Sequence, residues 1–268
     1  MNLTSLVNEI KSKQSFLCVG LDTDVRKLPD GIEKNEAGIL TFNKAIIDAT
    51  KDFAVAYKIN TAFYEHLGAA GWRVMEETRK YIPDSILKIA DAKRGDIGNT
   101  STMYAEAFFN TLDFDAVTVA PYMGYDSVQP FLEFKDKFTI VLGLTSNKGS
   151  VDFQTNTMYD PPLYQTVLNQ ISNWGTPENL MFVVGATKAE KLQEIRSIIP
   201  DHFLLIPGVG AQGGNASEVC INGKNNKGGL LINSSRGIIY SSNCTDFAEQ
   251  AHEAARKLAE ETQPYASI

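Results

Sequence analysis

The feature that most constrains the fold of this chain is a regular alternation of two kinds of segment. Short runs rich in Val, Ile, Leu and Phe recur along the sequence, and longer segments with helical spacing of apolar residues separate most of them. The runs are nearly continuous in apolar residues, which is typical of strands buried on both faces of a parallel sheet. The predicted strands are residues 16–20, 54–59, 86–91, 116–120, 138–144, 180–185, 203–207 and 229–233. The predicted helical segments are residues 38–50, 61–81, 101–112, 127–135, 164–173, 189–199 and 246–261.

Eight strands in alternation with helices predict a (β/α)8 barrel. The main alternative is a doubly wound open sheet, which has the same alternation of elements. No linker, internal repeat or low-complexity segment divides the sequence, and barrels of 268 residues are routinely single domains. We therefore expect residues 1–268 to form one catalytic barrel domain.

Composition narrows the classes of function. The net charge of −7 argues against a nucleic-acid-binding protein, which normally has a basic face. The sequence contains no signal peptide and no apolar run approaching the roughly 18 residues of a membrane span, so no membrane association is expected. Cys18, Cys220 and Cys244 are far apart and odd in number, which argues against a disulfide framework or a zinc site. We expect a cytoplasmic protein with reduced thiols.

A cluster of charge follows the third predicted strand. Residues 91–96 read DAKRGD, directly after the apolar run that ends at residue 90. Residues two apart in a strand point to the same face, so Asp91 and Lys93 are predicted to face the same space, with Asp96 on the following turn. A barrel has no structural need for such a cluster at the end of a strand, which indicates a chemical role.

Other strands also end in charged or polar residues. Asp22 follows the first predicted strand, Lys58 ends the second, and residues 233–237 (NSSRG) follow the eighth. Each residue alone could cap a turn or be solvated. Because the carboxyl ends of parallel strands meet at one end of a barrel, however, these side chains are predicted to form one site.

Two long loops are predicted at the same end of the barrel. Residues 145–162 follow the fifth strand, and residues 208–227 follow the seventh. The second loop contains Gly208, Gly210, Gly213 and Gly214, whose backbone N–H groups could turn toward an anion, and Arg236 supplies a cation suited to phosphate oxygens. Barrels frequently bind phosphate after strands seven and eight. The alternative is a flexible surface loop beside a surface arginine.

Residues 91–100 read DAKRGDIGNT, which closely resembles the active-site motif of the orotidine 5′-phosphate decarboxylase family. The strands that carry Asp22 and Lys58, the loop at residues 210–214 and the SRG sequence at 235–237 match the family in the same order, so the resemblance spans essentially the whole chain. The length and the segment at residues 58–65 resemble the longer bacterial branch of the family.

The resemblance implies a carboxy-lyase of pyrimidine synthesis, which converts orotidine monophosphate to uridine monophosphate and CO2 without a cofactor or a metal. It implies a charged tetrad made of Lys58, Asp91, Lys93 and Asp96, in which Lys93 is the proton donor. In the family the second aspartate of the motif reaches into the neighbouring subunit's site. Asp96 and Thr100 would therefore act across a homodimer.

The resemblance also assigns substrate contacts. Asp22 and Lys58 would hold the ribose hydroxyls, and Ser146 would contact the pyrimidine. Gln212 and Arg236, with the glycine loop that contains Gly210, Gly213 and Gly214, would hold the phosphate.

Two alternative functions remain open. A sugar-phosphate decarboxylase of the same superfamily resembles this sequence at the DxKxxD motif but requires magnesium. A non-catalytic barrel that merely binds nucleotides is the second alternative. Sensitivity to a chelator and release of CO2 distinguish the three possibilities.

Overall fold

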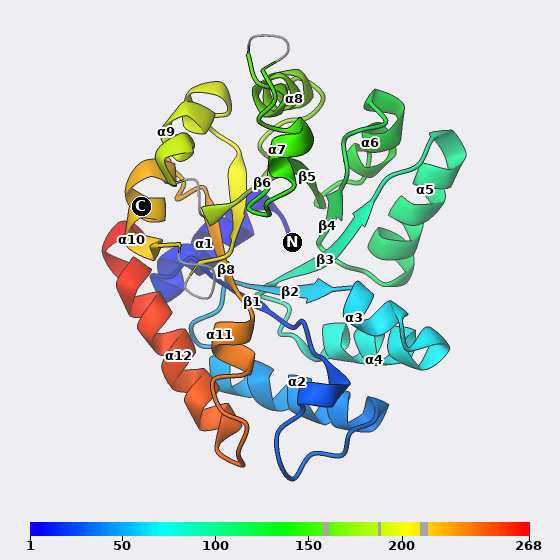
Figure 1. Ribbon diagram of the computed structural model, residues 1–268, viewed down its shortest axis with the longest axis vertical. Helices are drawn as coiled ribbons and strands as arrows, with labels where there is room; N and C mark the ends of the chain where they lie inside the picture. The colour runs from blue at the N-terminus through cyan, green and yellow to red at the C-terminus, as the bar shows by residue number, and fades with distance from the viewer. Residues whose placement is uncertain (158–160, 187–188, 210–213) are drawn as a thin grey trace.

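The barrel is closed, and all eight strands are parallel. The computed structural model describes residues 1–157, 161–186, 189–209 and 214–268. The strands pair in sequence order, and β1 pairs with β8, which confirms the predicted (β/α)8 barrel and excludes the open sheet (Figure 1). The strands are β1 (Leu17–Gly20), β2 (Ala56–Asn60), β3 (Leu87–Arg94), β4 (Ala116–Val119), β5 (Phe138–Leu144), β6 (Leu180–Val184), β7 (Phe203–Pro207) and β8 (Leu230–Ser234).

Helices surround the barrel. The larger helices are α1 (Leu3–Lys13), α2 (Glu36–Thr50), α4 (Gly68–Tyr81), α5 (Gly98–Glu106), α6 (Tyr125–Leu132), α8 (Leu163–Ser172), α9 (Ala189–Ile198), α10 (Ala216–Gly223) and α12 (Phe247–Thr262). Short helical segments are η1 (Val25–Lys27), α3 (Ala62–Glu65), η2 (Ala107–Thr111), α7 (Ser150–Phe153), α11 (Arg236–Ile239) and η4 (Gln263–Tyr265). Among the described residues, no helix is long and apolar enough to cross a membrane.

The apolar strand runs form the core, as expected for a parallel sheet covered by helices. Every residue of β1, β4, β6 and β8 is buried. Burial of apolar side chains such as these contributes roughly 1.5–3 kcal/mol each. Local signals define several helix starts: the side chains of Asn2, Asn35 and Asn215 each accept a hydrogen bond from a backbone N–H of the first turn.

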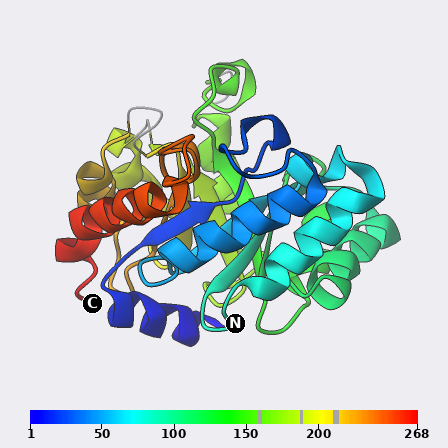
Figure 2. The ribbon, with the colours of Figure 1, turned by 90° about the horizontal axis from the view of Figure 1, so that it is seen from below.

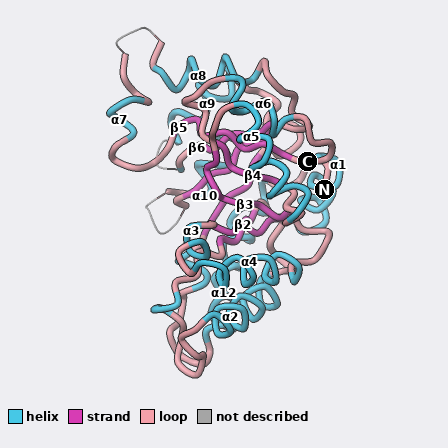
Figure 3. Tube along the Cα trace, turned by 90° about the vertical axis from the view of Figure 1, so that its right-hand side faces the viewer, coloured by secondary structure: helices cyan, strands magenta, loops and turns pink. Residues whose placement is uncertain are grey.

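Helix α1 closes the amino-terminal end of the barrel. Figure 2 shows it crossing that end, with both chain termini nearby, whereas the loops after the strands lie at the opposite end. Figure 3 shows α7 and the neighbouring loops at the end remote from the termini. The carboxyl-terminal end of the barrel is therefore the end that is free to hold a site.

The structure corrects the predicted secondary structure in five places. The predicted helix at 61–81 is divided into α3 and α4, because Gly68 adopts a left-handed conformation with φ of 62°. The predicted loops at 145–162 and 208–227 contain α7 and α10, and α1 lies before the first predicted element. Strand β3 continues to Arg94 rather than ending at Asp91, because its last residues pair with β4 after a shift in register.

Candidate active site

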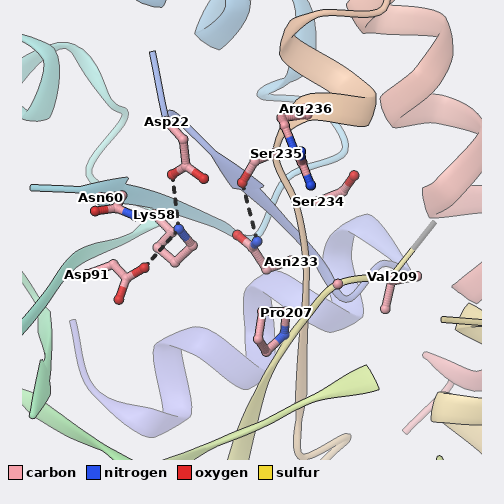
Figure 4. Close-up of a pocket in the computed structure, with 11 residues that line it drawn as sticks. Asp22, Lys58, Asn60, Asp91, Pro207, Val209, Asn233, Ser234, Ser235 and Arg236 are labelled. Carbon is pink, nitrogen blue, oxygen red and sulfur yellow. Dashed lines mark hydrogen bonds and ion pairs between the residues drawn. The ribbon is translucent and has the colours of Figure 1, made fainter. Parts of the chain in front are cut away.

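The site is centred on Lys58, a buried lysine at the carboxyl end of β2. Only 3% of Lys58 is exposed. Its Nζ lies 3.2 Å from Oδ1 of Asp22, which follows β1, and 3.2 Å from Oδ2 of Asp91 on β3 (Figure 4). Three neighbouring strands thus bring one ammonium group between two carboxylates.

Asp91 links Lys58 to Lys93. The Lys93 Nζ donates to Oδ1 of Asp91 at 2.6 Å, and the Thr118 hydroxyl donates to the same oxygen at 3.0 Å. The Lys93 N–H donates to the Thr118 Oγ1 at 2.9 Å. The predicted contact between Asp91 and Lys93 is present, although Lys93 has a φ of 48° where the β3–β4 register shifts. This irregular backbone, rather than regular strand alternation, brings the two side chains together.

The charges in this array stabilise one another. Burial alone would lower the pKa of Lys58, but the negative charges of Asp22 and Asp91 outweigh burial and raise the pKa above its usual range. Burial would raise the pKa of Asp91, but Lys58 and Lys93 lower it to about 2. At neutral pH the Lys58 ammonium is therefore held beside the ionised Asp91 carboxylate.

A cavity opens above these charges. Its lining includes Asp22, Lys58 and Asp91 on one side, and residues at and just after the carboxyl ends of β7 and β8 on the other. Among the latter, Asn233 and Ser234 are largely buried, and the Asn233 Nδ2 donates to the Ser235 Oγ at 3.4 Å. Gly20 allows this close packing, because a Cβ there would lie 1.8 Å from the Ser235 Oγ.

Arg236 lies at the edge of the cavity, where it begins α11. Its side chain is exposed and forms no ion pair with the residues that the structure describes. Gly208 has a φ of 92°, and Gly214 packs tightly, since a Cβ there would lie 2.7 Å from the Ala186 Cβ. The predicted site residues Gly210, Gln212 and Gly213 lie outside the described residues.

Asp96, Thr100 and Ser146 lie outside the hydrogen-bonded array that the described residues form around Lys58. The Asp96 carboxylate accepts a hydrogen bond from the Ile97 N–H at 2.8 Å and forms no ion pair within the described part of this single chain. Thr100 is exposed on α5. Ser146 follows β5 and packs against Gly185, where a Cβ would lie 2.8 Å from the Ser146 Cβ. Action of Asp96 and Thr100 in a neighbouring subunit stays a prediction.

The sequence analysis missed three polar residues that shape the site. Thr118 bonds to Asp91, Asn60 lines the cavity, and the Cys18 thiol lies 3.6 Å from the Asn233 Oδ1 beneath it. Thr118 is the only polar residue in the apolar run at 116–120, which was a usable signal. Burial raises the pKa of Cys18 to about 12, so the thiol stays protonated and can donate a hydrogen bond.

The arrangement favours chemistry on an anion. Lys93 is about half exposed and pairs with Asp91, which lines the cavity, so its ammonium can face a ligand while Asp91 fixes its position. A fixed cation can stabilise developing negative charge and can donate a proton to it. Among the described residues, no group of three or more His, Cys, Asp and Glu side chains is arranged to hold a metal ion.

Comparisons with known proteins agree with this architecture. Residues 15–251 match the model of the Orotidine 5′-phosphate decarboxylase / HUMPS family. The chain is 57% identical to orotidine 5′-phosphate decarboxylase of Flavobacterium johnsoniae and 54% identical to that of Bacteroides fragilis, and each alignment covers 97% of both chains. The structure resembles that of Leishmania donovani OMP decarboxylase with a TM-score of 0.87, at 37% identity and with 100% of both chains covered. The chain belongs to the orotidine 5′-phosphate decarboxylase family.

Proposed function

We propose that this protein is a carboxy-lyase that converts orotidine 5′-phosphate to uridine 5′-monophosphate and CO2, a step in pyrimidine synthesis. The observation that carries the proposal is the chain of charges Asp22–Lys58–Asp91–Lys93 at the mouth of the barrel, in a protein 57% identical to a decarboxylase of that name. The three cysteines are unpaired, which fits action in the cytoplasm.

Lys93 is the proposed proton donor. Loss of CO2 from the pyrimidine leaves negative charge at a ring carbon, with no adjacent carbonyl to delocalise it directly. An ammonium about 4 Å from that carbon would contribute roughly 4 kcal/mol at an effective dielectric constant near 20. The Lys93 ammonium can stabilise this charge and then donate a proton to the carbon.

Asp91 and Asp96 are proposed to keep the lysines charged and oriented. Asp91 already contacts both Lys58 and Lys93. Its carboxylate would also lie near the carboxylate of the substrate, and departure of CO2 would relieve their repulsion.

The remaining contacts with substrate are also proposals. Asp22 and Lys58 would bind the ribose hydroxyls, and Ser146 would contact the pyrimidine. The phosphate would be bound by Arg236, Gln212 and the glycine loop that contains Gly210, Gly213 and Gly214. Arg236 supports this assignment, because it is exposed at the cavity edge with no ion pair among the described residues, and a guanidinium binds phosphate through two parallel hydrogen bonds.

A homodimer is proposed to complete the site. A group of exposed apolar side chains lies on helices α5 and α6 and on the residues just before each of them: Ile97, Met103, Tyr122, Met123 and Tyr125. We call this group the dimer face. The Ser101 hydroxyl donates to the Ser127 carbonyl oxygen at 2.6 Å, which holds α5 against α6. Exposed apolar patches of this kind mark interfaces, and Asp96 lies next to Ile97 at its edge.

The first test is direct. Purified protein is expected to consume orotidine monophosphate, followed by absorbance, at the same rate with and without a chelator. Dependence on magnesium would instead favour the sugar-phosphate decarboxylases of the superfamily. Binding of uridine monophosphate without any release of CO2 would favour the non-catalytic barrel.

The proposed role of Lys93 has its own test. We expect Lys93→Ala to lower kcat by at least about 10³-fold, because both the stabilising charge and the proton donor are lost. Binding of uridine monophosphate is expected to persist. Lys80→Ala, which removes an exposed lysine of α4 that pairs with the neighbouring Glu76 and Glu77, is the control and is expected to retain activity. Substantial turnover by Lys93→Ala would refute the proton-donor role.

A further inference from the structure

A second cavity adjoins the candidate active site. We call it the outer pocket; Arg26, Lys27, Asp30, Lys34, Arg236 and Tyr240 are among its lining residues. Arg236 lines both this pocket and the cavity above Lys58. A group bound at Arg236 would therefore border both cavities.

The outer pocket is positive although the whole protein carries a net charge of −7. Arg26 contributes little, because its guanidinium pairs with Asp24 at 2.8 Å. Asp30 offsets one further positive charge. Three cations remain: Lys27, Lys34 and Arg236. None of them forms an ion pair within the described residues. After the charge of Asp30 is subtracted, two positive charges of the pocket are uncompensated. This is the charge that a phosphate group would complement.

Specific contacts hold the wall of the pocket beside Arg236 in place. Tyr240 follows α11, and its hydroxyl accepts a hydrogen bond from the Asp24 N–H at 2.7 Å. The Lys27 Nζ lies 5.8 Å from the centre of the Tyr240 ring, which places its charge over the ring face. Tyr240 therefore holds the segment of Lys27 against the helix that begins with Arg236.

We propose that the outer pocket binds the distal phosphate of a nucleoside 5′-diphosphate whose first phosphate contacts Arg236. The inference rests on the proposed function, because the nucleoside would occupy the cavity above Lys58. A nucleoside monophosphate ends at Arg236 and leaves the outer pocket empty. A diphosphate extends past Arg236 toward Lys27 and Lys34, and so competes with the substrate.

The test is calorimetric titration with UMP and with UDP, which needs no turnover. The wild-type protein is expected to bind UDP about tenfold more tightly than UMP. Lys27→Gln and Lys34→Gln are each expected to weaken UDP binding about threefold, and the double variant about tenfold, because exposed charge pairs are individually weak. UMP affinity is expected to be unchanged in all three variants.

Salt and a matched variant provide the controls. The preference for UDP is expected to shrink as ionic strength rises, because these lysines are exposed and their charges are screened. Lys135→Gln removes one exposed charge at the opposite end of the barrel, before β5, and is expected to leave both affinities unchanged. Inorganic pyrophosphate alone is expected to bind more weakly than UDP.

Three results would overturn the inference: equal affinities for UMP and UDP, a ratio that the double variant does not alter, or pyrophosphate that binds as tightly as UDP. A protein that shows the expected affinities but releases no CO2 from orotidine monophosphate would contradict the proposed function alone. The two failures are thus distinguishable.

Discussion

Asp91 accepts charge-assisted hydrogen bonds from two lysines in a largely buried position, and this has a consequence for stability. Its pKa of about 2 lies below the ordinary value of 3.8. A carboxyl group whose pKa is lower in the folded state stabilises that state above its unfolded pKa, and the stabilisation is lost as pH falls through the folded value. The difference corresponds to on the order of 2 kcal/mol, present at neutral pH and lost between about pH 4 and pH 2.

We therefore expect Asp91→Asn to lower the free energy of unfolding by about 2 kcal/mol at pH 7 and to have a much smaller effect near pH 2. Urea denaturation of both proteins across this range measures the difference. Asp52→Asn, which changes an exposed carboxylate with no ion pair among the described residues, is the control and should give a small difference at every pH. A difference in the free energy of unfolding between wild type and Asp91→Asn that stays the same at every pH would show that the lysines do not act through the charge of Asp91.

Charged residues at the ends of the predicted strands predicted most of the charged array around Lys58. The contacts that they did not predict depend on how neighbouring strands pair. Period-two alternation predicted that Asp91 and Lys93 lie together, although the contact forms through irregular backbone, and the order of the strands predicted that Lys58 lies near Asp22. The left-handed backbone at Lys93 and the hydrogen bonds of Thr118 depend on the β3–β4 register, which no local pattern specifies. The partners of Asp96 are not found in the described part of a single chain.

At the scale of elements, the segment that carries Asp22 is held from two sides. Buried Tyr64 donates to the Leu21 carbonyl oxygen at 3.0 Å, and the Asn43 Nδ2 donates to the Tyr64 hydroxyl at 2.9 Å. On the other side, the Asp24 N–H donates to the Tyr240 hydroxyl at 2.7 Å. Helices α2 and α3 and the end of α11 thus jointly fix the loop after β1.

We expect Tyr240→Phe to loosen this loop, because the Asp24 N–H loses its acceptor. The free energy of unfolding should fall by about 1–2 kcal/mol. If Asp22 binds the ribose, KM for orotidine monophosphate should rise several-fold more than kcat falls. Tyr265→Phe is the matched control, since the Tyr265 hydroxyl has no hydrogen bond among the described residues. If Tyr240→Phe lowers the free energy of unfolding but leaves KM unchanged, Tyr240 contributes to stability and not to substrate binding.

Apolar runs predicted the eight strands, because strands of a parallel barrel are buried on both faces. The helices that were missed also carried signals. Leu3, Leu6 and Ile10 have helical spacing and are the buried face of α1, and Asn2 caps it. Asn215, followed three residues later by Glu218, has the spacing of a capping box at the start of α10. Helix α10 has only eight residues and lies in a segment rich in Gly and Asn, so its few apolar residues do not stand out.

At the scale of the whole molecule, the barrel has one closed end and one reactive end. Helix α1 covers the amino-terminal end, and the charged cavity opens at the other. The dimer face lies to one side, over α5 and α6, and 90% of Tyr122 is exposed there. A two-fold pairing through this face would place the Asp96 of each chain near its partner, since a two-fold axis brings the same patch of both chains together.

A mixture of two inactive variants tests this arrangement. Lys93→Ala damages the site of its own chain, whereas Asp96→Ala should damage the site of the partner. In a mixed dimer, both defects fall in one site, and the other site receives an intact Lys93 from one chain and an intact Asp96 from the other. Because random pairing makes half of the dimers mixed, about a quarter of all sites should be intact, so the mixture should regain about 25% of wild-type activity. The variants are mixed under conditions that allow exchange of subunits, and Lys93→Ala mixed with Lys58→Ala, whose defects both lie in the chain's own site, is the control that should regain none. Activity no higher than that of the separate variants, despite demonstrated exchange, would mean that Asp96 acts within its own chain or not at all.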